Sequence, residues 1–473
     1  MQIKIQTPIS GLTSDSRKVR GGYLFAALPG TAMNGVHYIP QAIAQGASVI
    51  LAPAGTPRPE YGDIEFITDA NPRRAYAQAC AAFYQKQPGH IVAVTGTNGK
   101  TSTVNFVQQL WQSLGVHGAS LGTLGLKTPE RFVGGAMTTP DPQLLHETLA
   151  DLAEAGISHL AMEASSHGLD QARLDGVRLS AGAFTNLTQD HLDYHGNMDH
   201  YFKSKARLFA ELLPPDSAAI LNTHSGYFAQ LQRIAEDRHL RVFGYGRAEG
   251  GLIRYAEPEV VPAGYRLSID LAEEPFEMIL PLVGRFQIEN AMAALALVYA
   301  EECYDTSRLI ECAQHLKPVR GRLEFVTGHP NGAGVYVDYA HTPDALENAL
   351  LSLKDHCHGR LICVFGCGGD RDKTKRPLMA AAVEKHAQMS ILTDDNPRTE
   401  DPASIRADAL RGASHTKEIG DRREAIKYAL HSAGHGDIVL IAGKGHEQGQ
   451  DIQGVKYPFD DVSEVEQAME IWR

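Results

Sequence analysis

The sequence lacks any apolar segment long enough to cross a membrane. No run in the 473 residues approaches the roughly 18 consecutive apolar residues that suggest a transmembrane helix. The first ten residues, MQIKIQTPIS, also lack the apolar stretch of a secretory signal peptide. We therefore expect a cytoplasmic chain without a membrane partner.

Cysteine is scarce as well. The 6 cysteines are dispersed, at positions 80, 303, 312, 357, 363 and 367. Cys363 and Cys367 are the only close pair, and their surroundings of strand and glycine residues favour packing over zinc binding. We expect reduced thiols, as in a cytosolic protein.

Positive charge is in deficit. The chain has 44 Lys and Arg against 56 Asp and Glu, a net charge of −12, which argues against a general nucleic-acid-binding surface. An anionic substrate is still compatible, because local Arg and Lys side chains can hold one. At about 150 residues per domain, the length predicts roughly three domains.

The clearest positive signal is a phosphate-binding loop. Residues 91–94 are apolar and β-branched, which predicts a buried strand. The loop Thr95-Gly96-Thr97-Asn98-Gly99-Lys100-Thr101 follows, and apolar residues then recur at helical spacing to Leu114. Glycines allow backbone N–H groups to approach phosphate oxygens, and the helix N-terminus favours an anion. Lys100 would reach the terminal phosphates, and Thr101 would offer its hydroxyl to Mg²⁺.

The fit to the general nucleotide-loop pattern is incomplete. That pattern has Gly five residues before Gly99, where this chain has Val94. The alternative is an ordinary glycine-rich turn between a strand and a helix.

Two further segments place polar residues after predicted strands. Glu163 ends the strand Leu160–Ala164, where a Mg²⁺ ligand would lie. The strand 181–186 leads to a cluster of His and Asp residues, Asp190, His191, Asp193 and His195. Lys203 and Lys205 follow on a predicted helix, where surface charge is the simplest interpretation.

The C-terminal third alternates strands and helices. Predicted strands at 335–338, 361–365, 391–393 and 438–441 each precede a polar loop. Because the carboxyl ends of strands in an open α/β sheet line one crevice, the four loops predict a ligand-facing edge. We predict an α/β protein with domains at 1–87, 88–317 and 318–473.

A series of ordered segments is similar to the Mur ligase family over essentially the whole chain. They are GTNGKTS (96–102), MEASSHGLDQAR (162–173), TNLTQDHLDYHG (185–196), YFKSKARLF (201–209), RGRLE (320–324), DYAHTPDAL (338–346), GCGGDRDK (366–373), DNPR (395–398) and GKGHE (443–447). One departure is Met137, where some relatives have Asn.

The resemblance implies three domains: an N-terminal UDP-sugar-binding domain, a central P-loop ATPase domain and a Rossmann-like C-terminal domain that binds an amino acid. It also implies an ATP-dependent ligase of peptidoglycan precursor synthesis. The implied partners are UDP-N-acetylmuramoyl-L-alanyl-D-glutamate, meso-2,6-diaminopimelate and ATP, with Mg²⁺ as cofactor and a monomeric chain.

The resemblance also implies roles for individual residues. Catalytic roles fall on Lys100, Glu163, His191 and Lys205; the Mg²⁺ ligands are Thr101, Glu163, His191 and Lys205, the last as a carbamate. ATP contacts are Gly96, Thr97, Asn98, Gly99, Lys100, Thr101, Ser102, Asn290, Arg322, Asp338 and His341. The nucleotide-sugar contacts are Ser14, Ser16, Thr31, Ala32 and Met33. The muramoyl-dipeptide contacts are Thr138, Thr139, Ser165, Gln171 and Arg173. The amino-acid contacts are Arg371, Asp395, Asn396, Pro397, Arg398, Gly443 and Glu447.

Three other functions stay open at this point. A ligase of the same family with L-lysine as acceptor is the nearest, and a folylpolyglutamate synthetase would share the central fold without explaining DNPR. A nucleotide-dependent switch or binding module would need no acyl transfer.

Overall fold

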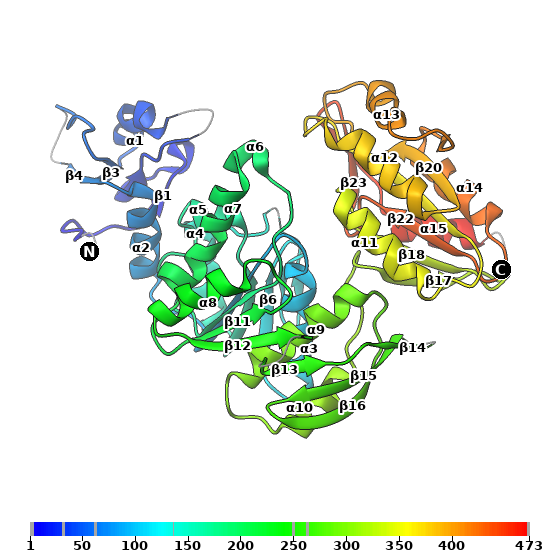
Figure 1. The fold of residues 1–473 in the computed structure, drawn as a ribbon. Coiled ribbons are helices and arrows are strands. Elements are labelled where there is room, and N and C mark those ends of the chain that lie inside the picture. The colour runs from blue at the N-terminus through cyan, green and yellow to red at the C-terminus, as the bar shows by residue number, and fades with distance from the viewer. Residues whose placement is uncertain are drawn as a thin grey trace.

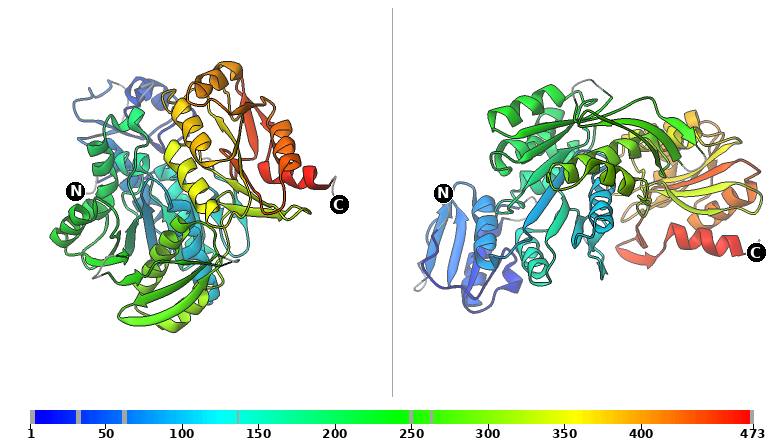
Figure 2. Two further views of the ribbon diagram at one scale, coloured as in Figure 1. Left: turned by 45° about the vertical axis from the view of Figure 1, so that its right-hand side comes forward. Right: turned by 90° about the horizontal axis from the view of Figure 1, so that it is seen from below.

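Three α/β units follow one another along the chain in a computed structural model that describes residues 4–30, 34–60, 64–135, 137–247, 251–261 and 264–470. Figures 1 and 2 show the first and last units at opposite ends of the central one. Each unit has its own sheet and its own apolar core. Thr31, Ala32 and Met33, predicted to contact the nucleotide-sugar, lie outside the described residues.

The N-terminal unit is a parallel sheet with neighbouring order β1-β2-β3-β4. Its elements are β1 (Gly11–Thr13), η1 (Ser16–Lys18), β2 (Tyr23–Ala26), η2 (Gly35–Tyr38), α1 (Ile39–Ala44), β3 (Val49–Pro53), β4 (Glu65–Asp69) and α2 (Pro72–Tyr84). Helix α2 begins at Pro72 because the Asn71 side chain caps it and proline suits the first helical position.

The central unit contains a large sheet with order β14-β15-β13-β12-β11-β10-β5-β9-β6-β7-β8, and β16 pairs with β15. Its strands are β5 (His90–Thr95), β6 (Gly118–Gly122), β7 (Gly125–Lys127), β8 (Phe132–Val133), β9 (His159–Glu163), β10 (Ala181–Phe184), β11 (Ala218–Asn222), β12 (Arg241–Gly246), β13 (Ile253–Tyr255), β14 (Glu259–Val261), β15 (Gly264–Leu271) and β16 (Glu274–Leu280). Its helices are α3 (Lys100–Ser113), α4 (Pro142–Glu154), α5 (Ser166–Asp170), α6 (Leu192–His195), α7 (Met198–Arg207), η3 (Leu208–Leu212), α8 (Phe228–Asp237), α9 (Arg285–Tyr299) and α10 (Thr306–Ala313).

The middle of this sheet positions the site. Strands β5, β9 and β10 are parallel neighbours, so their carboxyl ends deliver the phosphate loop, Glu163 and the segment after Phe184 to one edge. Helices α3 and α9 cover one face, and α4 and α8 cover the other. Helix α9 is buried along most of its length, from Gln287 to Val298.

The C-terminal unit has sheet order β17-β18-β22-β19-β20-β21, in which β18, β22, β19 and β20 are parallel. Its strands are β17 (Glu324–Gly328), β18 (Gly334–Asp338), β19 (Leu361–Cys367), β20 (Met389–Asp394), β21 (Lys417–Glu418), β22 (Ile438–Ala442), β23 (Gly449–Ile452) and β24 (Val455–Pro458). Its helices are α11 (Pro343–Lys354), α12 (Lys375–His386), α13 (Pro402–Leu410), α14 (Arg422–Ser432) and α15 (Asp461–Met469). The four predicted strands and their common edge are confirmed.

No described helix combines the length and the apolar character of a membrane span. Cys363 and Cys367 are buried thiols on β19, as the packing interpretation requires, and all six cysteines are free.

We expect His146 on α4 to make stability depend on pH. Its side chain is buried, with Nε2 3.3 Å from the Asp175 carbonyl oxygen, and burial lowers its pKa to about 4. The unfolded chain, with a pKa near 6.5, binds a proton that the folded chain excludes between these two values. The contribution of His146 is therefore intact above pH 6.5 and is lost as pH falls toward 4, by about 2 kcal/mol at pH 5. Denaturant unfolding of wild type and His146→Gln at pH 7 and pH 5 should show a smaller pH effect in the variant; equal pH effects would contradict this.

Candidate active site

The phosphate loop between β5 and α3 requires glycine at two positions. Gly96 has φ +147°, and a Cβ there would lie 1.9 Å from Thr185 Oγ1. Gly99 has φ +88°, and a Cβ there would lie 2.2 Å from Asn290 Oδ1. Any side chain at either position would push the loop away from its neighbours, so the Gly-x-x-Gly spacing fixes the loop's conformation.

The loop is held from the neighbouring segment that follows β10. The Asn98 backbone N–H donates to Asn186 Oδ1 at 2.9 Å, and Thr185 Oγ1 donates to the Asn98 carbonyl oxygen at 2.6 Å. Ser102 and Thr101 are buried in the first turn of α3. The first turn of this 14-residue helix has backbone N–H groups without intrahelical partners, the arrangement that binds phosphate.

Lys100 is the first residue of α3 and is half-buried. Its Nζ donates to the carbonyl oxygens of Gly96 at 2.9 Å and Thr97 at 2.8 Å, and burial lowers its pKa. The ammonium group therefore lies over the loop itself, beside the place where an anion would bind.

Glu163 ends β9, and His191 lies in the segment after β10; these two strands flank β5. The Glu163 carboxylate is buried and accepts from the Thr123 backbone N–H at 2.8 Å and from Thr123 Oγ1 at 3.1 Å. His191 has φ +53° and places Nε2 3.4 Å from Asp190 Oδ2. Burial lowers the His191 pKa to about 4, so its imidazole is neutral at pH 7 and can serve as a metal ligand.

Lys205 on α7 is 1% exposed, which makes the surface-charge interpretation wrong. Its Nζ donates to the Gly96 carbonyl oxygen at 2.6 Å, the same oxygen that Lys100 Nζ contacts. Burial, and next the charge of Lys100, hold the Lys205 pKa well below its usual value. Lys203, two residues earlier, is exposed and pairs with Asp199 at 3.2 Å, as surface charge does.

The predicted dipeptide contacts lie together beside Glu163. Arg173 donates to the Thr139 carbonyl oxygen at 2.7 Å and to Gln171 Oε1 at 2.8 Å. Thr138 Oγ1 lies 3.0 Å from Thr123 Oγ1, and Ser165 caps α5 by accepting from the Gly168 N–H at 3.0 Å. This group therefore shares Thr123 with the Glu163 carboxylate.

Residues of the C-terminal unit reach the phosphate loop. Arg322 Nη2 donates to Thr101 Oγ1 at 3.3 Å, and its guanidinium group lies 4.7 Å from the centre of the Tyr339 ring. Asn98 Nδ2 donates to Asp344 Oδ2 at 3.3 Å. These contacts bring the predicted ATP residues of both units to one place.

Asp338 and His341, at the carboxyl end of β18, shape that junction. Asp338 accepts from the backbone N–H groups of Leu323 at 2.6 Å and Ala340 at 2.7 Å, and burial raises its pKa. His341 Nδ1 lies 2.7 Å from the Tyr339 carbonyl oxygen, and burial lowers its pKa. Asn290, also predicted, is buried on α9 behind Gly99.

The DNPR loop after β20 presents Arg398. Its Nη1 donates to the Gly369 carbonyl oxygen at 2.5 Å, and its backbone N–H donates to the Asp451 carbonyl oxygen at 2.9 Å. The neighbouring acids have other partners: Glu400 pairs with Arg376 and Lys373, and Asp401 caps α13.

The rest of the predicted amino-acid site surrounds this loop. Asn396 Nδ2 donates to Glu447 Oε2 at 2.8 Å, and Asn396 Oδ1 accepts from Lys444 Nζ at 2.9 Å. Gly443 has φ +118°, and a Cβ there would lie 2.5 Å from Asp395 Oδ2. Pro397 is buried, whereas Arg371 is exposed at the cavity rim.

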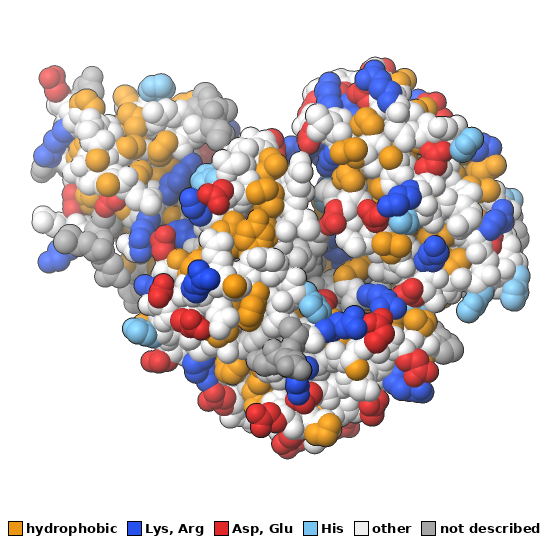
Figure 3. All heavy atoms as spheres, viewed as in Figure 1, with side chains coloured by type: hydrophobic (Ala, Val, Ile, Leu, Met, Phe, Trp, Pro, Cys, Tyr) orange, Lys and Arg blue, Asp and Glu red, His pale blue; other side chains and the backbone are white. Residues whose placement is uncertain are grey.

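A cavity of about 980 Å³ lies between the central and C-terminal units (Figure 3). Among the predicted residues in its lining, His191 comes from the central unit, and the C-terminal unit contributes His341, Arg371, Asp395, Asn396, Arg398, Gly443 and Glu447. A second cavity of about 940 Å³ adjoins it through Tyr339, Asn396, Arg398 and Glu447, and reaches Thr123 and Thr138. Arg398 therefore faces both.

The predicted residues of the N-terminal unit stand apart from this cleft. Ser14 is exposed after β1, and Ser16 is buried, with Oγ donating to Gln41 Oε1 at 3.1 Å. Neither lines the two cavities. The sequence analysis missed two residues of the site. Thr123 hydrogen-bonds to Glu163 but lies in no recognised motif. Tyr339 lies under the Arg322 guanidinium group and could have been found, because it is part of the segment DYAHTPDAL.

Comparison with known families gives three matches along the chain. The Mur ligase family catalytic domain matches residues 8–84, the Mur ligase middle domain matches residues 94–298, and the Mur ligase glutamate ligase domain matches residues 321–445.

Individual relatives match over nearly the full length. The UDP-N-acetylmuramoyl-L-alanyl-D-glutamate–2,6-diaminopimelate ligase of Caulobacter vibrioides is 47% identical, with 98% of this chain and 96% of the relative covered. The protein of the same name from Bradyrhizobium diazoefficiens is 46% identical, with 98% and 95% covered.

Solved structures give the same picture. A structure of a ligase with that name matches with a TM-score of 0.71 and 35% identity over 99% of this chain and 97% of the other. A folylpolyglutamate synthase from Mycobacterium tuberculosis matches at TM-score 0.64 and 19% identity over 78% of this chain and 92% of the other, which shows a shared fold alone.

Proposed function

The chain belongs to the Mur ligase family, and on that premise we propose that it ligates meso-2,6-diaminopimelate to UDP-N-acetylmuramoyl-L-alanyl-D-glutamate. The bond joins an amine of diaminopimelate to the D-glutamyl γ-carboxylate, with ATP converted to ADP and phosphate. The observation that carries the proposal is the cleft between the two units. In it, His191 near the phosphate loop faces the DNPR loop, residues 395–398.

The proposed substrate sites follow the three units. The domain boundaries 1–87, 88–317 and 318–473 remain our prediction, with the UDP group on Ser14, Ser16 and residues 31–33. The dipeptide would lie along Thr138, Thr139, Ser165, Gln171 and Arg173, and ATP on the phosphate loop with Asn290, Arg322, Asp338 and His341. We further propose that the chain acts as a cytoplasmic monomer in peptidoglycan precursor synthesis.

The residues beside the phosphate loop fit Mg²⁺. Glu163 is a buried carboxylate whose hydrogen bonds come only from neutral Thr123 groups among the described residues, so a cation would balance its charge. Thr101, Glu163, His191 and a carbamate on Lys205 would hold the metal, which when bound would neutralise phosphate charge.

Two lysine amines around one carbonyl oxygen, of which Lys205 is buried, support the carbamate. Lys100 Nζ and Lys205 Nζ both contact the Gly96 oxygen, so two ammonium charges there would repel. Burial favours the neutral amine of Lys205, which is the form that captures CO₂. The product is an anion with hard oxygen atoms beside the Lys100 cation.

The reaction would proceed in two steps. An oxygen of the γ-carboxylate attacks the terminal phosphorus of ATP and ADP leaves, which converts a poor acyl donor into an acyl phosphate. Lys100 and the α3 N-terminus offset the negative charge that gathers there. The free amine of diaminopimelate then attacks the acyl carbon, loses a proton, and displaces phosphate to form the amide. Closure of the central and C-terminal units would bring the reacting atoms together and exclude water.

The direct test is the requirement for both substrates. ADP release should need the UDP-linked dipeptide and diaminopimelate together, with one amide formed per ADP. ADP release without either would favour a nucleotide-dependent switch, and release with a folate instead of the dipeptide would favour a folylpolyglutamate synthase.

Arg398 should set the preference for diaminopimelate over lysine. Diaminopimelate has a second carboxylate that lysine lacks, and a guanidinium fork binds a carboxylate with two donors. Leaving one charge of such a buried pair without its partner costs about 2–5 kcal/mol. This cost corresponds to a preference for diaminopimelate over lysine of about 30-fold to several thousandfold. In steady-state assays, we expect Arg398→Ala to raise the diaminopimelate KM by at least about 30-fold and to leave the ATP KM nearly unchanged.

The matched control is Arg411→Ala, which removes an exposed arginine of the same unit that pairs with Asp408. It should behave as wild type. Use of lysine by the wild type as readily as diaminopimelate, or full preference in Arg398→Ala, would show that this loop does not read the second carboxylate.

A further inference from the structure

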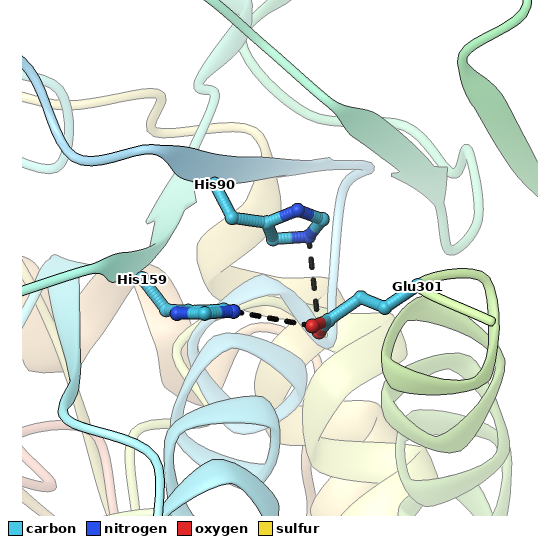
Figure 4. A group of neighbouring side chains, drawn as sticks. All are labelled: His90, His159 and Glu301. Carbon is cyan, nitrogen blue, oxygen red and sulfur yellow. Dashed lines mark hydrogen bonds and ion pairs between the residues drawn. The ribbon is translucent and has the colours of Figure 1, made fainter. Parts of the chain in front are cut away.

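Two histidines and a glutamate meet at the edge of the central sheet away from the phosphate loop. His90 is the first residue of β5 and His159 is the first residue of β9, and the two are paired in register on these parallel strands. Glu301 follows the end of α9 and points at both rings (Figure 4). The phosphate loop lies at the opposite end of β5, so this cluster is separate from the site described above.

The three side chains have the spacing of metal ligands. One ligand atom from each lies within 4.8 Å of the others, in the one such group of His, Cys, Asp and Glu among the described residues. His159 Nε2 is 3.2 Å from Glu301 Oε2, and His90 Nε2 is 3.7 Å from Glu301 Oε1. Tetrahedral Zn²⁺ with ligands at about 2.0–2.1 Å places neighbouring ligand atoms about 3.3 Å apart. Small side-chain movements would therefore suffice.

Without a metal, one polar atom of the cluster is left over. Glu301 is already engaged by Trp111 Nε1 at 2.6 Å and by His159 Nε2, while His90 Nε2 is buried and has no hydrogen-bond partner among the described residues. A buried polar atom without a partner is costly, and an ion shared by the three side chains would satisfy it.

The surroundings hold the three ligands in place. Ser158 Oγ contacts His159 Nδ1 at 2.8 Å, which orients the ring so that Nε2 faces Glu301. The Trp111 ring packs edge-on against both imidazoles, with ring centres 6.1 Å from His90 and 5.1 Å from His159. Burial also lowers the His90 pKa, which favours the neutral imidazole that binds metals.

The ligand chemistry selects among metals. Two imidazoles and one carboxylate suit Zn²⁺ and similar transition metals, whereas Mg²⁺ prefers oxygen ligands. The His90 and His159 side chains are 23% and 19% exposed, so an ion could enter and keep a water molecule as fourth ligand. We propose that His90, His159 and Glu301 form a Zn²⁺-binding site that ties the start of β5 to β9 and to the end of α9.

The test uses the full chain, stripped with a chelator and kept in excess Mg²⁺ to occupy oxygen-rich sites. Titration with Zn²⁺ alone should show about one tight site per chain and a higher melting temperature, and Co²⁺ should give the visible absorption of a low-symmetry site. His90→Gln and Glu301→Gln should lose the tight site and the Co²⁺ spectrum.

The matched control is His224→Gln, which removes another histidine paired with a glutamate of α9, at 2.9 Å from Glu289. It should bind Zn²⁺ as wild type does. Equal Zn²⁺ affinity in wild type and in folded His90→Gln would overturn the proposal. So would a wild-type chain without a tight Zn²⁺ site in excess Mg²⁺, which needs no variant to fold.

Discussion

Replacing Lys205 with alanine should reduce the ligation rate by about 10³-fold or more and leave the chain folded. The loss follows from the proposed carbamate, which supplies an anionic oxygen ligand beside the phosphates. The fold should persist because Lys205 is 1% exposed without an ion-pair partner among the described residues. Its removal costs the hydrogen bond to the Gly96 carbonyl oxygen and the contact with the Tyr201 ring, but it also relieves the desolvation of a buried amine.

A small carboxylate should partly restore that activity. Acetate can occupy the space left by the side chain and present an oxygen anion at the same place, so steady-state rates of Lys205→Ala should rise with acetate concentration. Intact-protein mass spectrometry of the wild type under CO₂ should show the added mass of one carbamate, lost in the variant.

Lys203→Ala is the matched control for Lys205→Ala. It removes an exposed lysine from the same helix, two residues away, that pairs with Asp199. We expect full activity from it. A fully active Lys205→Ala variant would rule out the carbamate, and a loss of activity with no response to any small carboxylate would leave the role of an anionic ligand unsupported.

Lys100→Ala should abolish ligation to a similar extent, by about 10³-fold or more. The hydrogen bonds that Lys100 Nζ makes to described residues go to backbone carbonyl oxygens of its own loop. The side chain can therefore turn to the terminal phosphates and offset their charge as the acyl phosphate forms. The effect should appear in kcat for ADP release, because the charge that Lys100 offsets builds up as the phosphoryl group is transferred.

Thermal unfolding separates this role from a structural one. Lys100→Ala should melt within a few degrees of the wild type, and Lys86→Ala, which removes an exposed lysine paired with Glu154, should be as active as the wild type. Near-normal turnover by folded Lys100→Ala would mean that the loop does not bind the phosphates of ATP.

The local sequence was sufficient to predict the strands, the loops and the helix that surround the site. The apolar run 91–94, the glycines at 96 and 99 and the helical spacing after Thr101 predicted β5, the loop and α3, because short-range sterics and periodicity decide these features. Likewise, four strand-then-polar-loop patterns predicted the binding edge of the C-terminal sheet, because parallel strands end at one edge.

The local sequence could not predict which side chains are buried. Lys203 and Lys205 are alike in type and share one helix, yet one is exposed and the other is buried against the phosphate loop. Which lysine faces the loop depends on how α7 packs, and that packing also produces the depressed pKa of Lys205.

The sequence by itself determined the family, the order of the three units and the identity of the loops that meet in the cleft. The tertiary structure alone decided which distant residues share an atom or a charge. The Gly96 carbonyl oxygen accepts hydrogen bonds from both Lys100 and Lys205. Arg322 of the C-terminal unit donates to Thr101 of the central unit. His90 and His159 both contact Glu301. The physical reason is that burial, hydrogen bonding and charge act through space, between residues that chain folding brings together from far apart in sequence.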